Sequence, residues 1–253
     1  MKFSIKENLR KIQKLLPYVS VFVVIFTLGF TFEGFRIRRE FIKLGVEVKP
    51  MHHLIYMAIS TIIVYLIKEV AYRVVDPMVD SRIEKIYPPE AWKEKKTKGS
   101  YYAVGLVWYS IISLIGTYLC WDAPNVPRYF LGSMNGPLTM QDFPAASDIP
   151  YLTFYYMLQM GSRNYSMIRT LLKERHLKNF HEMFLHHLLT LFLMLFSYFT
   201  NTYNIGVIVL LIHDWGDWGH KVTQFWKDIF PHMKPWVSFP IGFFLFSVIR
   251  CVY

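Results

Sequence analysis

The chain has 253 residues, of which 53% are apolar and 18% charged, and its mean hydropathy is +0.26. This composition excludes a soluble α/β enzyme and is typical of a protein that crosses a membrane several times. Lys and Arg number 28 against 18 Asp and Glu. Because basic residues commonly flank membrane helices, we attribute the excess to membrane orientation and predict no nucleic-acid partner.

Apolar runs recur along the chain at about the 20-residue length that a helix needs to cross a bilayer. These runs are continuous, whereas the strands of a membrane barrel alternate over roughly 10 residues. We therefore predict an all-α membrane bundle of about seven transmembrane helices, within a range of six to eight. The expected spans are Leu15–Phe32, Leu54–Val75, Tyr101–Trp121, Pro150–Leu172, Phe184–Thr200, Tyr203–Gly219 and Trp236–Tyr253.

The Lys and Arg residues between these spans predict the orientation. One set of connections, which includes the amino terminus and the Lys173–Met183 linker, holds 17 of them, and the other set holds six. The positive-inside rule places the first set on the cytoplasmic or matrix side. Five of the six residues on the other side lie between Arg36 and Lys49, where the bias is weakest.

Two connections are long. Asp76–Ser100 mixes both signs of charge and predicts a solvated loop or a surface helix. Asp122–Ile149 contains four prolines, which exclude a continuous helix. Without an internal repeat or a low-complexity tract, residues 1–253 form one predicted membrane domain, with amino-terminal spans and loops in 15–149 and the motifs described below in 150–253.

The fifth expected span carries a polar stripe along one helical face. Its members follow one another at steps of four and three: Met183, His187, Thr190, Met194, Ser197 and Asn201. His186 lies beside the stripe. For Thr190, Ser197 and Asn201 we favour hydrogen bonds between helices, which polar residues in membrane spans commonly make.

The sixth expected span carries His213, Asp214 and Asp217. Because only a short turn joins it to the fifth span, we expect antiparallel neighbours with their histidine clusters at similar depth. Ionisable groups in a span are costly unless they face a cavity or a partner. Together with His186 and His187, these residues predict a catalytic site in which imidazoles act as general base or nucleophile.

Metal binding is a minor alternative for the histidines. Membrane di-iron hydroxylases and desaturases use repeated HxxHH-type boxes, which this chain lacks although it has nine histidines. A single zinc or iron could be held by three imidazoles and a carboxylate. We predict no metal and no cofactor.

The chain resembles the ceramide synthases and the wider TLC-domain family over Lys178–Asp217, which reads KNFHEMFLHHLLTLFLMLFSYFTNTYNIGVIVLLIHDWGD. That signature has a K-D-F-x-E-M-like start, a paired His, a Thr three residues later, then S-Y-x-x-N, an I-G or similar pair, and H-D-x-x-D. The matching residues here are His186, His187, Thr190, Ser197, Tyr198, Asn201, Gly206, His213, Asp214 and Asp217. Tyr155 and Tyr156 resemble the tyrosine pair in the preceding span.

The resemblance implies an N-acyltransferase that joins a fatty acyl group to the amine of a sphingoid base, with acyl-CoA as co-substrate and membrane lipids as surroundings. It implies catalytic roles for His186, His187, His213, Asp214 and Asp217. One of the paired histidines would take the acyl group or deprotonate the amine. It also implies substrate contacts through Tyr155, Tyr156, Thr190, Ser197 and Asn201, and CoA binding near Lys173, Arg175 and Lys178.

Two positions depart from the family pattern. Asn204 stands where the family commonly has Arg, and Lys221 stands where it has an acidic residue. These departures support an alternative: a catalytically altered accessory or lipid-binding subunit of a larger membrane complex, with other membrane subunits as partners. The enzyme hypothesis implies the endoplasmic reticulum. The subunit hypothesis makes the mitochondrial inner membrane plausible, because the amino terminus is basic.

Overall fold

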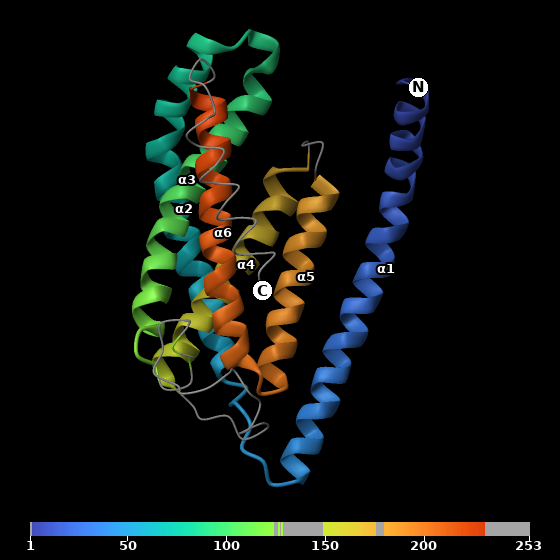
Figure 1. Ribbon diagram of the computed structural model, residues 1–253, viewed down its shortest axis with the longest axis vertical. Helices are drawn as coiled ribbons and strands as arrows, with labels where there is room; N and C mark the ends of the chain where they lie inside the picture. Colours follow the sequence, from blue (N-terminus) through green and yellow to red (C-terminus); the bar gives the residue numbers. More distant parts are fainter. Residues whose placement is uncertain (1, 124–125, 127, 129–148, 176–179, 231–253) are drawn as a thin grey trace. The chain divides into compact units, whose positions relative to one another are not determined.

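The computed structural model describes residues 2–123, 126, 128, 149–175 and 180–230, and in 2–20 it describes the backbone alone. These residues form six α-helices without a strand among them (Figure 1). The helices are α1 (Lys2–Lys43), α2 (His53–Ile86), α3 (Pro89–Cys120), α4 (Pro150–Lys173), α5 (Phe180–Phe199) and α6 (Tyr203–Ile229). The predicted all-α membrane fold is thereby confirmed.

Each of the first six expected spans lies in one of these helices, apart from the last residue of the third and fifth spans, Trp121 and Thr200. Three of the helices, α2, α3 and α5, are long and apolar enough to cross a membrane by length and composition. Charged residues such as Arg163 in α4 and Asp217 in α6 lower the hydropathy of their helices. The seventh expected span, Trp236–Tyr253, lies outside the described residues, as does most of the connection Asp122–Ile149.

The connection Asp76–Ser100 is helical rather than a loop. Helix α2 continues to Ile86 and α3 begins at Pro89, so the charged segment extends both helices beyond their apolar parts. Proline suits the first turn of a helix, because the N–H that it lacks would have no partner there.

The described helices are distributed over two compact units. The first unit contains residues 1–61, 140–148 and 157–203, and the second contains residues 62–139, 149–156 and 204–253. Helices α2 and α4 therefore contribute residues to both units, α1 and α5 belong to the first, and α3 and α6 belong to the second, except for Tyr203 at the start of α6, which falls in the first.

In the first unit, α1 packs against α5 through aromatic rings. The ring centroids of Phe30 and Phe196 are 4.8 Å apart, and those of Phe35 and Phe199 are 4.4 Å apart. Between them lies Gly34, where an added Cβ would come within 3.2 Å of the Phe196 ring. The small residue thus admits the larger rings of α5.

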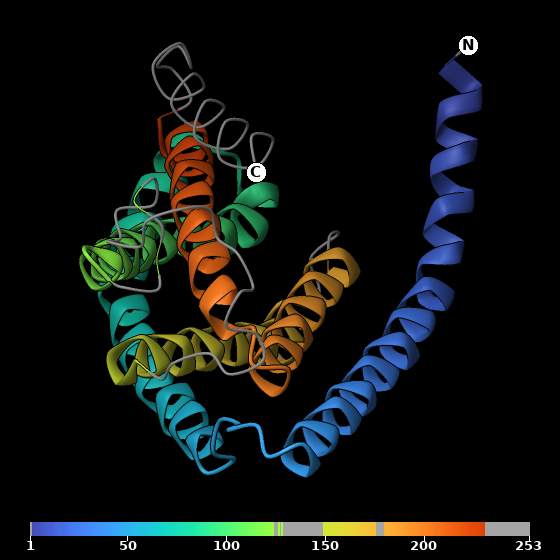
Figure 2. The same ribbon diagram turned by 60° about the horizontal axis from the view of Figure 1, so that its bottom comes forward.

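Helices α2 and α4 also meet in the first unit (Figure 2). A Cβ at Gly161 of α4 would lie 2.6 Å from Cβ of Ser60 and 2.7 Å from the backbone nitrogen of Thr61. Asn164 donates a hydrogen bond to the Thr61 hydroxyl over 3.2 Å. This contact has the small residues and the polar bridge that are typical of helix pairs in membranes.

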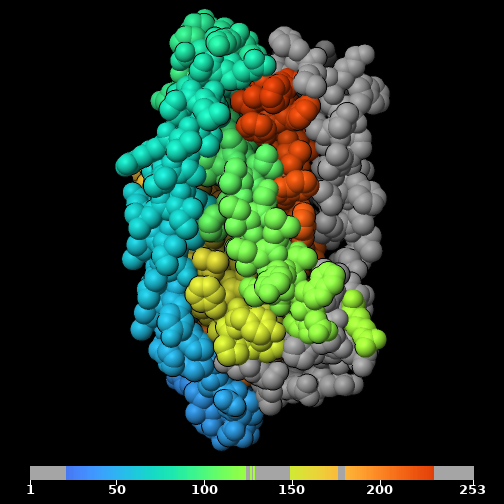
Figure 3. Space-filling view, turned by 90° about the vertical axis from the view of Figure 1, so that its left-hand side faces the viewer, coloured from blue at the N-terminus to red at the C-terminus, as the bar shows by residue number. Residues whose placement is uncertain are grey.

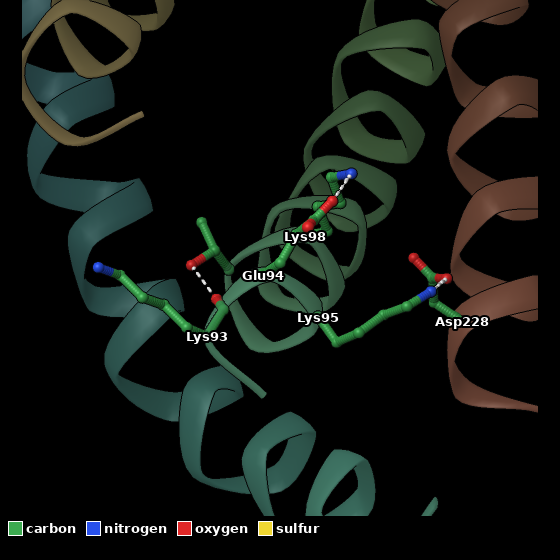
Figure 4. Close-up of polar contacts among 6 residues, drawn as sticks. Lys93, Glu94, Lys95, Lys98 and Asp228 are labelled. Carbon is green, nitrogen blue, oxygen red and sulfur yellow. Dashed lines mark hydrogen bonds and ion pairs between the residues drawn. The ribbon is translucent and has the colours of Figure 1, made fainter. Parts of the chain in front are cut away.

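In the second unit, α2, α3 and α6 lie side by side (Figure 1 and Figure 3). Val79, Ile83 and Ile229 form a buried apolar cluster where α2 and α6 meet. In the same region Lys95 of α3 pairs with Asp228 of α6 over 2.6 Å, as Figure 4 shows. The charged ends of the three helices are therefore joined by both apolar and ionic contacts.

Candidate functional site

The paired histidines of α5 differ in burial. Their ring centroids are 5.5 Å apart, but His187 is buried while His186 is exposed. Successive residues of an α-helix point about 100° apart, so two adjacent side chains cannot share one environment. Of the pair, His187 faces the interior of the first unit.

The hydroxyl side chains of the predicted polar stripe bond locally. Thr190 Oγ1 donates to the carbonyl of His186 over 2.8 Å, which is the bond to the preceding turn that Thr commonly makes in helices. Ser197 accepts a bond from the Thr202 hydroxyl over 3.2 Å. Both are only partly buried.

Asn201 lies two residues after the end of α5 and holds the turn between α1 and α2. Its φ of 56° lies in the left-handed region, which Asn tolerates better than most residues. Its amide nitrogen donates to the carbonyl of Glu47 over 2.8 Å, and its amide oxygen accepts from the backbone N–H of Lys49 over 3.4 Å. These bonds go to the backbone of a turn rather than to a neighbouring helix.

Tyr198 adds a second tie to the same turn. It is fully buried, and its hydroxyl donates to the carbonyl of Pro50 over 2.9 Å and lies 3.0 Å from Nδ1 of His53. The sequence motif includes Tyr198, but its partners are 145 and 148 residues away in the chain. No sequence pattern indicates contacts of that range.

The second unit contains a buried carboxylate with a tyrosine donor. Asp214 of α6 has 0% exposure, and the hydroxyl of Tyr155 of α4 donates to its Oδ2 over 3.2 Å. Gly116 of α3 makes room for the tyrosine, because an added Cβ there would clash with the hydroxyl oxygen. Tyr156, beside Tyr155, is also buried. The bond joins Tyr155 and Asp214, which the resemblance had both singled out.

The other ionisable groups of α6 are less buried. His213 is half-buried, and its Nδ1 lies 2.8 Å from the carbonyl of Val209, one turn earlier. Because a carbonyl only accepts, Nδ1 is the protonated nitrogen, and Nε2 of the neutral ring is then a base. Asp217 is half-buried and His220 is exposed.

Contacts with α3 fix the rotation of α6 about its own axis, and the sequence analysis did not predict them. Trp215 donates to the Thr117 hydroxyl over 3.2 Å, and Trp218 donates to the Ser110 hydroxyl over 2.8 Å. Lys221, one of the departures from the family pattern, is buried with Nζ 3.7 Å from the centre of the Tyr101 ring. The tryptophans could have suggested such contacts, but their partners could not be inferred.

The basic linker after α4 is only partly described. Lys173 and Arg175 are exposed, and Arg175 donates to the carbonyl of Leu171. Lys178 lies outside the described residues. Between the first two, Glu174 is buried and pairs with Arg169 over 3.2 Å. The side chains of Lys173 and Arg175 are thus exposed to solvent, while Glu174 forms an ion pair with Arg169.

The predicted residues fall into two clusters, one in each unit. The paired histidines belong to the first unit, and Tyr155, His213, Asp214 and Asp217 belong to the second. The expectation that the histidines of α5 and α6 lie at similar depth stays a prediction. Within the described part of the chain, no three His, Cys, Asp or Glu side chains gather as they would around a metal ion.

Comparison with known proteins covers the part of the chain that holds these clusters. The family model of the TLC domain matches residues 101–253. The chain belongs to the TLC domain family. Every predicted site residue lies within the matched range, including all members of both clusters.

The chain is also similar to named ceramide synthases over part of its length. Ceramide synthase LOH2 of Arabidopsis thaliana is 30% identical over 126 residues, which are 50% of this chain and 38% of that protein. Ceramide synthase 1 of Homo sapiens is 32% identical over 133 residues, or 51% of this chain and 33% of that protein. Ceramide synthase 4 of Bos taurus is 36% identical over 78 residues, or 31% and 20%. The matches therefore span less than half of each relative, and no solved structure matches the chain.

Proposed function

We propose that this integral membrane protein is a ceramide-synthase-like N-acyltransferase that uses acyl-CoA to acylate a sphingoid base. The observation that carries the proposal is the TLC-domain pattern of paired histidines and H-D-x-x-D, with His187 and Asp214 both buried. Buried ionisable groups in a membrane protein are costly and indicate function. Similarity to ceramide synthases from a plant and from mammals supports the substrate class. The endoplasmic reticulum is the location that this function implies.

The reaction requires a base that takes the proton of the amine, and a nucleophile of the protein can carry the acyl group between the thioester and the amine. The carbon–sulfur bond of the thioester breaks, a carbon–nitrogen amide bond forms, the amine loses a proton, and CoA leaves as the thiol. Imidazole suits both roles near neutral pH. We assign His187 the role of taking the acyl group or the amine proton, because it is buried while His186 is exposed.

The second unit has a charged group and a base of its own. Asp214, held by Tyr155, would stabilise positive charge that develops beside it in that unit. His213 has its Nδ1–H bonded to a backbone carbonyl, which leaves Nε2 for a proton. The exposed Lys173 and Arg175 would attract the phosphates of CoA.

The test is acyl transfer from labelled acyl-CoA to sphinganine by the full chain in detergent. His187→Ala should lower kcat by at least about 100-fold, the scale at which general bases contribute. His181→Ala is the matched control, since it removes an imidazole from the first turn of the same helix and should leave kcat within about twofold of wild type. Equal turnover of His187→Ala and wild type would remove His187 from the mechanism.

The alternative function is an accessory or lipid-binding subunit, and one observation favours it. Lys221, which replaces an acidic residue of the family pattern, is packed over Tyr101 and along Gly105, where its Cε would lie 3.1 Å from an added Cβ. A lysine held in this way acts as a packing residue. A stoichiometric complex with other membrane subunits in mild detergent, with no acyl transfer by the folded protein, would support this function. Turnover by the isolated chain would exclude it. The mitochondrial inner membrane belongs to this alternative.

A further inference from the structure

The end of α1 and the turn after it carry the basic residues that the orientation rule leaves unexplained. Two of them have acidic partners on α1 itself. Arg36 bonds to Glu33 and Lys43 bonds to Glu40, with nitrogen–oxygen distances of 2.5 and 2.8 Å, and all four side chains are largely exposed. These pairs account for two of the five basic residues between 36 and 49.

Arg38 is different because it is buried. It is 8% exposed, and within the described residues its terminal nitrogen Nη1 has no hydrogen-bond partner. It follows Gly34 by one turn on the face of α1 that packs against α5. Burial lowers the pKa of Arg38, and the phenol of Tyr198 acts in the opposite sense. A guanidinium keeps its charge even so, and a buried charge without an anion is strongly unfavourable.

A second buried cation lies in the turn that follows α1. Lys49 is 4% exposed, and its Nζ stands 4.3 Å above the centre of the Tyr203 ring. Asn201 holds the backbone of Lys49, and Tyr198 holds the carbonyl of Pro50. The end of α5 therefore fixes the turn that carries Lys49 and supplies the phenol that acts on Arg38.

We propose that Arg38, with Lys49, binds the phosphate of an anionic phospholipid at the turn between α1 and α2. The planar guanidinium can donate two parallel bonds to phosphate oxygens. Apolar side chains at the turn and on the preceding part of α1, among them Leu44, Ile42 and Phe32, are exposed and offer a surface for the acyl chains. A phosphate at headgroup level would supply the anion that Arg38 needs. This lipid site is separate from the proposed reaction, whose histidine, His187, lies in the first half of α5.

The experiment measures thermal unfolding of the full chain in uncharged detergent with added lipid. The probes are short-chain phosphatidylglycerol, phosphatidylcholine with the same chains, and inorganic phosphate. Phosphatidylglycerol should raise Tm in a saturable manner, because a ligand that binds the folded state stabilises it. Phosphatidylcholine should act more weakly, since its choline adds a further positive charge near Arg38 and Lys49.

Two matched substitutions identify the binding residue. Arg38→Met should raise the half-saturating concentration of phosphatidylglycerol at least tenfold, the scale of a lost charged hydrogen bond. Arg39→Met removes the same charge from the exposed neighbour on α1 and should leave that concentration unchanged within about twofold. If Arg38→Met does not fold, Arg38→Lys takes its place. Lysine keeps the charge but cannot donate two parallel hydrogen bonds to phosphate, so binding should weaken several-fold.

Two results would overturn the proposal. One is equal stabilisation of wild type and Arg38→Met by phosphatidylglycerol. The other is equal stabilisation of wild type by inorganic phosphate, which would indicate an ion site without a lipid. Acyl transfer is not measured in this experiment, so its outcome is independent of the proposed enzymatic function.

Discussion

At the scale of single residues, the pair of Tyr155 and Asp214 shows how burial couples two polar side chains. Asp214 has no exposed surface, so its carboxylate has lost the water that would solvate it. The phenol hydroxyl replaces part of that solvation with a bond of 3.2 Å. In a low-dielectric interior such a bond is stronger than in water, and its loss is correspondingly costly.

We expect Tyr155→Phe to destabilise the protein by about 1.5–3 kcal/mol, because a buried carboxylate loses a donor while the ring keeps its shape. Tyr151→Phe is the control, since Tyr151 begins the same helix, α4, and is exposed. It should change the free energy of unfolding by less than about 0.5 kcal/mol. The measurement is denaturant unfolding in detergent.

A double-mutant cycle with Asp214→Asn isolates the bond itself. The loss from Tyr155→Phe should become smaller in the Asp214→Asn background, because the amide no longer presents a charge to the hydroxyl. Losses that simply add would show that the hydroxyl stabilises the fold through another partner.

At the scale of elements, close approach between helices depends on single small residues. Gly161 of α4 stands against the backbone of α2, so an added methyl group must move a helix rather than a side chain. We expect Gly161→Ala to lower the free energy of unfolding by about 1–3 kcal/mol, as overpacking does elsewhere. Gly29→Ala in α1, where an added Cβ meets nothing within 4 Å, should be neutral or stabilising by up to about 1 kcal/mol. Similar unfolding midpoints for the two variants would contradict the close approach of α2 and α4.

The charged extension of α3 offers two ion pairs of unequal burial (Figure 4). Asp228, the partner of Lys95, is 7% exposed, whereas Glu94, the partner of Lys98, is 45% exposed. Asp228→Asn should therefore cost about 1–3 kcal/mol, since it removes the charge from a desolvated pair. Glu94→Gln should cost no more than about 0.5 kcal/mol, and its small effect should vanish in high salt. Equal costs in low salt would mean that the pair between α3 and α6 is not desolvated.

The elements could be predicted because apolar periodicity and length are local properties of the sequence. Six helices lie where runs of apolar residues indicated spans, with ends extended by charged residues that hydropathy cannot recognise as helical. The segment around Lys93–Lys98 shows the limit. Its charges suit a loop or a helix, and contacts with Asp228 and with the cluster of Val79, Ile83 and Ile229 accompany the helical state.

The candidate site was predictable by residue and less so by contact. A motif can single out Asp214 and Tyr155, yet the bond between them depends on Gly116 of a third helix. The ties of Tyr198 and Asn201 to residues 47–53 join segments about 150 residues apart in the chain. Such contacts follow from how helices pack, and a single sequence holds no local signal for them.

At the scale of the whole molecule, the burial of polar residues is uneven. Charged and titratable side chains are among the buried residues of the helices, with His187 and Arg38 in the first unit and Asp214 in the second. Over residues 54–70 the exposed side chains of α2 are instead apolar or Tyr, with Ile55, Ile59, Ile62 and Leu66 among them. This reversal of the soluble pattern is what a lipid environment favours, because lipid solvates apolar side chains and excludes charges.

Helix α2 gives the sharpest test of orientation in the membrane. It has 34 residues, about 51 Å of helix, and it is apolar enough to span. Its two ends should therefore lie on opposite sides, with Lys85 on the cytoplasmic or matrix side and Met51, two residues before the helix begins, on the other. Both side chains are exposed.

We expect an impermeant maleimide to label Lys85→Cys in inside-out vesicles and Met51→Cys in right-side-out vesicles, in a chain whose Cys120 and Cys251 are replaced by Ala. Lys85→Cys removes one positive charge and could itself affect the orientation. Met51→Cys leaves the number of positive residues unchanged and therefore serves as the control for charge. Labelling of both positions from one side would show that α2 does not cross the membrane.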